Sequence, residues 1–175
     1  ERIRQEKGFS MQETPLEPVT TQDEETFTFE NGTAADSTSG VYLEFTLHFM
    51  AAADMVVHLT SADSSSGAGD GTEVTSENAA LPSSMRISFA TDGKTWIYDP
   101  GMGNISVTEG NATTFGLPAR DAMDLNDDNA MFSMKEGVNK EVKVHIWMEG
   151  TDPACTDDLK AADYAIRMRF TGESK

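Results

Sequence analysis

Histidine is the residue of this chain best suited to acid–base or metal chemistry, and it occurs three times. His48, His58 and His145 each occupy an outward position of a segment in which apolar and polar residues alternate. None of them belongs to a zinc-binding H-E-x-x-H pair, and the chain has no G-x-S-x-G nucleophile motif. We therefore interpret the three histidines as surface residues and predict that the protein is not an enzyme.

The single cysteine, Cys155, has acidic neighbours at Asp152, Asp157 and Asp158. Nearby carboxylates raise the pKa of a thiol and disfavour the reactive thiolate, whereas a helix N-terminus at the same place would favour it. We predict a packed, unreactive thiol. One cysteine cannot form an internal disulfide, so the count does not settle the redox compartment.

The stretch "DLNDDN" is the best candidate for a metal site. Asp124, Asn126 and Asp128 alternate as the first ligands of a calcium-binding EF-hand loop do. The sixth position is Asn129 instead of glycine and the twelfth is Lys135 instead of glutamate, which argues against an EF-hand. Two interpretations stay open, an irregular calcium site and a solvated acidic turn. No other cofactor is predicted.

Two tryptophans and three glycosylation sequons are candidates for the surface. Trp96 and Trp147 point outward by strict alternation, where they would stack on sugar rings or pack in a subunit interface. A second core wrapped over the sheet would bury them instead and is the commoner arrangement. The sequons begin at Asn31, Asn104 and Asn111 and indicate surface loops.

Charge and length restrict the class of protein. The 175 residues include 13 basic and 30 acidic ones, giving a net charge of −17. Such a surface repels phosphate backbones and anionic lipid, which argues against nucleic acid or bare membrane as a partner, and it suits solubility or cation-assisted assembly. No apolar run is long enough to span a bilayer. The sequence starts at Glu1 rather than methionine, as after removal of a secretion signal or of an expression tag.

The elements that must position these residues are strands, because apolar residues recur with period two. We predict two hairpins, one joining 41–50 to 55–61 through "AAAD" and one joining 85–90 to 94–100 through the turn "TDG". Further strands are predicted at 26–32, 141–150 and 164–172.

One short helix is predicted, in "TDPACTDDLKAADY". Asp152 would be its N-cap and Pro153 its first residue, so the helix would connect the last two strands. The segments 61–84 and 116–132 are predicted loops. The fold class is therefore all-β, an antiparallel β-sandwich or jelly roll with one short connecting helix near the C-terminus. Residues 1–22 form an N-terminal extension and 23–175 the β-sandwich domain.

The N-terminal extension has two open interpretations. It is mixed in charge, carries Ile3, Phe9 and Met11, and ends in prolines before the first clear strand. Such a segment is either a disordered leader or a short strand with a Pro-stiffened linker, available to a neighbouring sheet.

The stretch "KVHIWMEGTDPACTDDL", residues 143–159, resembles a signature of the TasA/camelysin group, secreted β-sandwich proteins of biofilm fibres in Gram-positive bacteria. In that group a strand of the type V-x-I-W-x-E-G-x-D-P-x-C leads into a short helix and a final strand. The resemblance covers about residues 40–172 by arrangement. It implies a jelly roll, secretion, and fibres in which the N-terminal segment of one subunit completes a sheet of the next. Ile3, Phe9 and Met11 would then lie at the subunit interface.

We expect a structural subunit of an extracellular filament, a pilus or biofilm-matrix fibre, on the cell surface. Its partner would be further copies of itself, with other surface or matrix proteins as further candidates. The proteolytic activity attributed to camelysin-type proteins is not carried over, because the chain has no zinc motif. The alternative is a secreted carbohydrate-binding or adhesin module that uses outward aromatics and a calcium loop, and a hydrolase ranks third.

Overall fold

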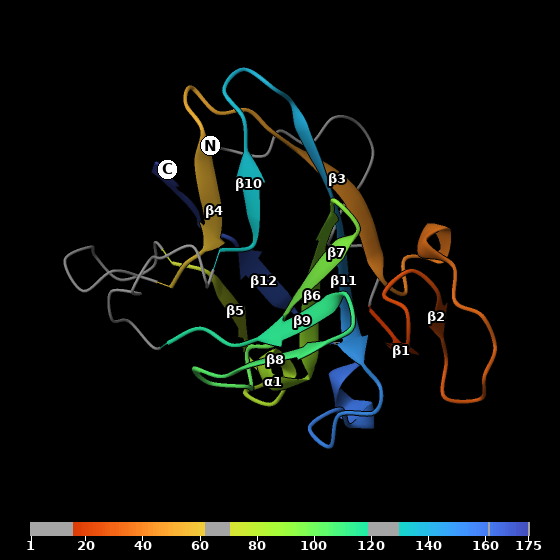
Figure 1. The fold of residues 1–175 in the computed structure, drawn as a ribbon. Helices are drawn as coiled ribbons and strands as arrows, with labels where there is room; N and C mark the ends of the chain where they lie inside the picture. Colours follow the sequence, from red (N-terminus) through yellow and green to blue (C-terminus); the bar gives the residue numbers. More distant parts are fainter. Residues whose placement is uncertain (1–15, 62–70, 119–129, 161, 175) are drawn as a thin grey trace.

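The computed structural model describes residues 16–61, 71–118, 130–160 and 162–174. Within these ranges the chain is built mainly of strands, arranged in one sheet of eight strands, one of three and one of two (Figure 1). The predicted all-β fold class is confirmed. No helix in this part of the chain is long and apolar enough to cross a membrane.

The large sheet is centred on its longest strand, β11 (Lys140–Glu149). On one side of β11 the order is β6 (Met85–Thr91), β7 (Lys94–Tyr98), β9 (Ala112–Phe115) and β8 (Ser106–Glu109).

Two strands share the other side of β11. β3 (Leu43–Phe49) pairs antiparallel with its first seven residues, and β1 (Pro18–Thr21) pairs parallel with Met148 and Glu149. β2 (Phe27–Thr28) continues the sheet beyond β1. Two strand pairs, β1–β11 and β7–β9, are parallel, so the sheet is mainly antiparallel rather than wholly so.

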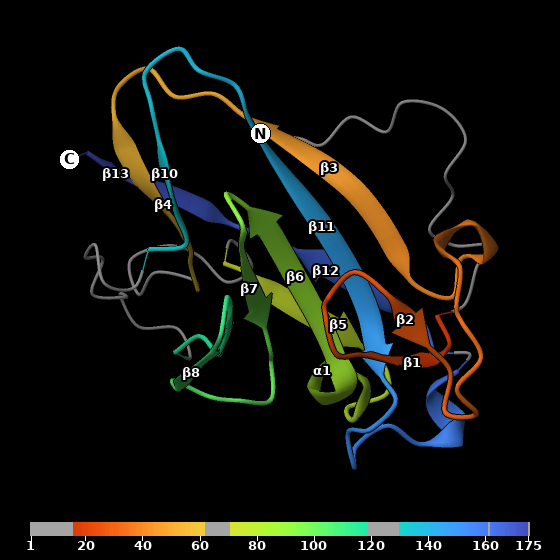
Figure 2. The ribbon, with the colours of Figure 1, turned by 45° about the vertical axis from the view of Figure 1, so that its right-hand side comes forward.

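The smaller sheets form the second layer of the sandwich (Figure 2). One has the order β10 (Phe132–Met134), β4 (Met55–Leu59) and β13 (Phe170–Ser174), and the other pairs β5 (Glu73–Ser76) with β12 (Tyr164–Arg167). Leu59 of β4 and Val74 of β5 are buried in the same core as Phe89 of β6. The main core therefore lies between the large sheet and both smaller ones.

Alternate residues of β11 supply the middle of this core. Val142, Val144, Ile146 and Met148 are all buried there, as the period-two pattern predicted. The last predicted strand, 164–172, is in fact two strands, β12 and β13, which belong to different sheets. Its apolar face is nonetheless confirmed, because its alternate apolar residues pack against the main core.

A second core lies on the opposite face of the large sheet, under the N-terminal layer that runs from β1 to Tyr42. Trp147 and Ile97 come from the sheet, and Val19, Phe27, Val41 and Tyr42 come from the layer. The rings of Phe27 and Tyr42 stack at 4.2 Å between centroids, and the Trp147 ring meets Phe27 edge-on. The interpretation that a second core buries Trp147 is confirmed.

One predicted hairpin is present and the other is not. β6 and β7 pair through a tight turn in which Asp92 and Gly93 have φ of 53° and 72°, the left-handed conformation that such turns require. β3 and β4 do not pair, because β3 joins the large sheet and β4 the three-stranded one. Alternation identified both strands correctly, but it carries no information on which sheet a strand enters.

The predicted connecting helix is a single 3₁₀ turn, η3 (Asp157–Leu159), whose N-cap is Thr156 rather than Asp152. The Asp152 carboxylate instead accepts a hydrogen bond from the Ala154 N–H at 2.8 Å and closes a turn. The other helical segments are η1 (Ser37–Ser39) and α1 (Leu81–Ser84), the latter in a predicted loop. β1, β5, β8, β9 and β10 were also missed, because each has only three or four residues and such short segments carry little hydrophobic alternation.

Candidate functional site

The free margin of β3 is the candidate site. β3 pairs with β11 through seven consecutive residues, from Leu43 opposite Ile146 to Phe49 opposite Lys140. No other strand of the described residues pairs with β3, which forms the outer margin of the large sheet in Figure 2. Because alternate residues of an antiparallel strand direct their N–H and C=O groups away from the partner, this margin can accept a further strand.

The core face of β3 is incompletely covered. Phe45, Leu47 and Phe49 pack against the main core, yet each remains partly exposed. Their neighbours on β11, Val142 and Val144, are fully buried. A strand added beside β3 would cover the remaining apolar surface, so both backbone hydrogen bonds and apolar burial would favour its binding.

The opposite face of β3 carries polar side chains. His48 is exposed, as predicted, and its Nδ1 lies 3.8 Å from a Glu141 carboxylate oxygen. Glu44 contacts His145 Nε2 at 2.7 Å and Lys143 Nζ at 3.4 Å through the same oxygen, Oε2. The hydrogen bond with His145, followed by the charge of Lys143, lowers the pKa of Glu44 although partial burial opposes the shift.

The N-terminal segment enters the fold beside the first residues of β3. The Glu17 N–H donates to the Val41 carbonyl at 3.1 Å, and Leu16 is buried in the main core. Residues 16–21 are thus part of the chain's own fold, and β1 is part of its large sheet. The candidate interface residues Ile3, Phe9 and Met11 lie outside the described residues.

Two of the three histidines do not lie on the surface. His145 is buried on the second-core face of β11, where the Phe27 ring packs against it at 5.2 Å, and its Nδ1 has no hydrogen-bond partner among the described residues. His58 on β4 is fully buried, and within the described part of the chain neither ring nitrogen has a hydrogen-bond partner. The prediction of surface residues was wrong for both, because it assumed that each sheet has one covered face. The adjacent Trp147 was the sequence signal that the outer face of β11 is also covered.

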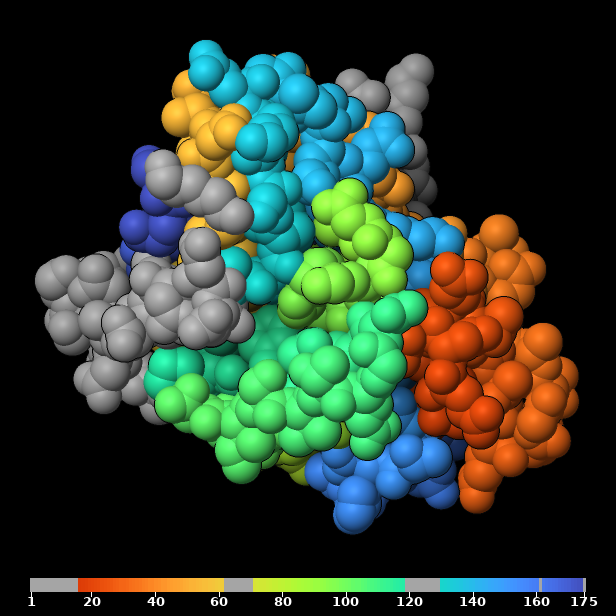
Figure 3. Space-filling model, viewed as in Figure 1, coloured from red at the N-terminus to blue at the C-terminus, as the bar shows by residue number. Residues whose placement is uncertain are grey.

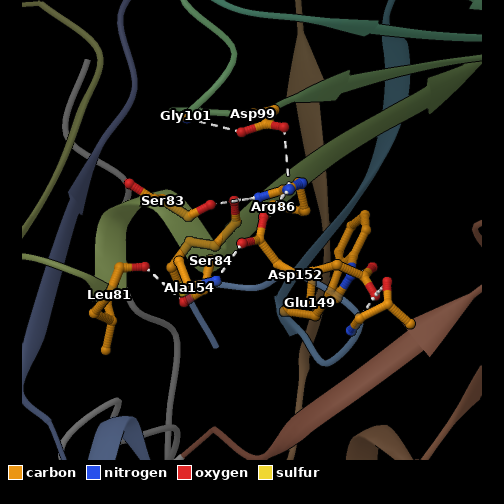
Figure 4. A network of polar contacts seen from close by, with 12 residues as sticks. Leu81, Ser83, Ser84, Arg86, Asp99, Gly101, Glu149, Asp152 and Ala154 are labelled. Atoms are coloured by element: carbon orange, nitrogen blue, oxygen red, sulfur yellow. Dashed lines mark hydrogen bonds and ion pairs between the residues drawn. The ribbon is translucent and has the colours of Figure 1, made fainter. Parts of the chain in front are cut away.

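The turn after β11 is held by a buried ion-pair network rather than by a helix (Figure 4). Arg86 Nη2 lies 2.6 Å from Asp152 and 3.1 Å from Asp99, while Nη1 donates to the Ser83 carbonyl at 2.8 Å. All three charged side chains are mostly buried. Burial raises the pKa of Asp99 in spite of the attraction of Arg86.

This ion-pair network indicates that the stretch 143–159 has a structural role. It joins β6, the end of β7 and the turn that follows β11, so the chain leaves the sheet in a fixed direction. Cys155 lies beside it and is half-buried; burial, then Asp152 and Glu149, raise the pKa of its thiol. The prediction of an unreactive thiol agrees with this environment.

The structure adds little support for the candidate calcium site or for the two tryptophans as sugar-binding residues. Asp124, Asn126 and Asp128 lie outside the described residues, and the described part of the chain holds no group of three or more metal-ligating side chains. Trp147 is buried and donates its indole N–H to Glu149 at 2.9 Å. Trp96 is half-buried against the main core.

Comparison with protein-family models, with curated proteins and with solved structures returned no match to this chain. The likeness to the TasA/camelysin group therefore stays a prediction that rests on residues 143–159.

The Glu44–His145 contact should make stability depend on pH. Because folding lowers the pKa of Glu44, its ionised form stabilises the native state above the ordinary carboxyl pKa, and this contribution is lost as the pH falls through the lowered value. We expect Glu44→Gln to cost about 1 kcal/mol at neutral pH, a small effect because Glu44 is partly exposed. Urea denaturation of both proteins across the acid range measures it. If the difference in the free energy of unfolding between the two proteins does not narrow as the pH falls, the ionised Glu44 does not stabilise the native state in this way.

Removing the centre of the Arg86 network should have a larger effect. Arg86→Ala leaves two carboxylates mostly buried without their cation, so we expect a loss of about 3–5 kcal/mol in the free energy of unfolding. The matched control is Arg167→Ala, which removes a partly exposed pair with Glu73 at 2.6 Å and should cost at most about 1 kcal/mol. Equal losses in urea denaturation would show that the network does not hold the turn.

Proposed function

We propose that the protein is the structural subunit of an extracellular filament, a pilus or biofilm-matrix fibre at the cell surface. Residues 1–15 of one subunit would add as a strand to the free margin of β3 in the next, giving head-to-tail growth. The observation that supports the proposal is the edge of β3, with which no other described strand pairs and whose three apolar side chains are half-covered, directly beside the entry of the N-terminal segment.

The lengths are compatible with strand donation. An extended segment of 15 residues spans about 50 Å, whereas the seven residues of β3 span about 23 Å. A strand can therefore cover β3 of a neighbour and leave several residues as a connection. Because Leu16 and β1 belong to the subunit's own core and sheet, the donor is limited to the residues before Leu16.

The carbohydrate-binding alternative has lost support. It relied on Trp96 and Trp147 as exposed platforms for sugar rings, but Trp147 is buried and Trp96 packs half-buried on the main core. Stacking on a sugar requires an accessible aromatic face. We therefore carry the filament proposal alone.

Removal of residues 1–15 tests the donor. We expect filaments from the full chain and monomers from the truncated one, by electron microscopy and light scattering, with circular dichroism unchanged because every described core residue is retained. A synthetic peptide of residues 1–15 should bind the truncated protein, whereas a scrambled peptide should not. Filaments from the truncated chain, or equal binding of the two peptides, would refute strand donation.

Introducing a charged side chain on β3 tests whether the edge of this strand is the acceptor for the donated segment. Thr46 is an exposed residue of β3 and Thr108 an exposed residue of β8, the strand at the opposite margin of the sheet. Lysine on an edge strand hinders the addition of another strand. We expect Thr46→Lys to shorten or abolish filaments and Thr108→Lys to leave them unchanged in electron micrographs. The reverse result would assign the acceptor to β8.

A further inference from the structure

The β8–β9 hairpin is a second exposed margin with apolar side chains. All four residues of β8 are exposed, and β9 alone of the described strands pairs with it. Val107 is 45 % exposed, and Ile105, just before the strand, is 59 % exposed. The hairpin forms the lower front of the molecule in Figure 3. Such an edge is open to unwanted pairing unless something covers it.

Two sequons flank this strand. Asn104 lies two residues before β8, and Asn111 lies in the turn between β8 and β9. Both asparagines are exposed. Their hydroxyl partners are Ser106, which is exposed, and Thr113, whose Oγ1 lies 3.0 Å from that of Thr108. Each end of β8 therefore presents an Asn-x-Ser/Thr acceptor on the surface.

The backbone holds both acceptors in place. A Cβ on Gly116 would lie 1.6 Å from the Gly103 carbonyl oxygen, so the loop before Asn104 packs directly against the end of β9. The Gly116 N–H donates to the Ile105 carbonyl at 2.9 Å. At the other end, the Asn111 carbonyl accepts the N–H of Thr95 at 2.9 Å. The two acceptors are thus fixed to the sheet and not carried on a long loop.

We propose that Asn104 and Asn111 are attachment sites for N-linked glycans. The co-substrate would be an oligosaccharide joined to a lipid carrier through a diphosphate. The asparagine Nδ2 attacks the anomeric carbon, a C–N bond forms and the C–O bond to the diphosphate breaks. The lipid diphosphate leaves with the bonding electrons, and the amide nitrogen gives one proton to a base of the transferring enzyme.

Glycans at these two positions would cover both ends of β8 and shield Ile105 and Val107. The margin at β8 would then be closed to strand addition, and that of β3 would stay open. This inference rests on the proposed function in one respect, because export from the cell would bring the chain to the membrane-bound enzyme that transfers the glycan. Glycans beside β8 would explain why filaments grow through the β3 edge only.

The test is transfer in vitro to the folded full chain. The chain is incubated with a purified single-subunit oligosaccharyltransferase and a lipid-linked oligosaccharide, then analysed by intact mass and peptide mapping. We expect glycans on Asn104 and Asn111, and each of Asn104→Gln and Asn111→Gln should lose one. Thr113→Ser should keep the glycan on Asn111 and Thr113→Val should lose it. Transfer only to Asn31, which lies on a separate exposed turn, or no transfer, would overturn the proposal.

The consequence for the edge is tested with the same material. At concentrations above those at which the chain lacking residues 1–15 is monomeric, light scattering should show irregular aggregates of this truncated, unglycosylated chain. Val107→Lys should suppress them, and the glycosylated truncated chain should not form them. Glycosylation that leaves such aggregation unchanged would overturn the shielding role. The mass readout does not depend on filaments and applies equally to the chain lacking residues 1–15. Failure of glycosylation is therefore distinguishable from failure of strand donation.

Discussion

Burial of β11 on both faces is the constraint on which the rest of this structure depends. Its even-numbered residues, from Val142 to Met148, enter the main core, and His145 and Trp147 enter the second core. A strand covered on both faces needs a partner on both sides, because its backbone groups have no access to water. β6 supplies one side along the strand. On the other side β3 covers only seven residues, so the N-terminal β1 must complete the pairing.

The N-terminal layer covers the smaller of the two cores, which makes it the weaker half of the fold. His145 Nδ1 and Ser88 Oγ are buried on this side of the sheet, at paired positions of β11 and β6, with no hydrogen-bond partner among the described residues. Each such group costs about 1–3 kcal/mol. Local opening is drawn from the least stable part of a structure, so the layer from β1 to Tyr42 is expected to open before the main sandwich. That layer carries the segment we assign as donor.

The sequence predicted the strands with strong alternation, and it failed where a strand has two covered faces or is short and polar. In "VYLEFTLHFM" one face of β3 is exposed to solvent, so alternation predicted the inward residues from Leu43 to Phe49 correctly. It failed at Val41 and Tyr42, which precede the strand and are both buried in the second core. In β4 both Val56 and His58 are buried, and the same rule placed His58 on the surface. The candidate acceptor edge was not predictable, because an edge is defined by which strands pair, and pairing between distant segments leaves no mark in local periodicity.

The net charge limits which interactions can drive the proposed assembly of this chain. At a net charge of −17, two copies repel one another, so attraction between whole surfaces cannot supply the affinity. A donated strand gains backbone hydrogen bonds and apolar burial over a short contact, and both act at a range where the repulsion is only a modest opposing term. Added salt would screen the repulsion and leave these short-range contacts nearly unchanged. Assembly should therefore strengthen with ionic strength, whereas an assembly held by complementary charges would weaken.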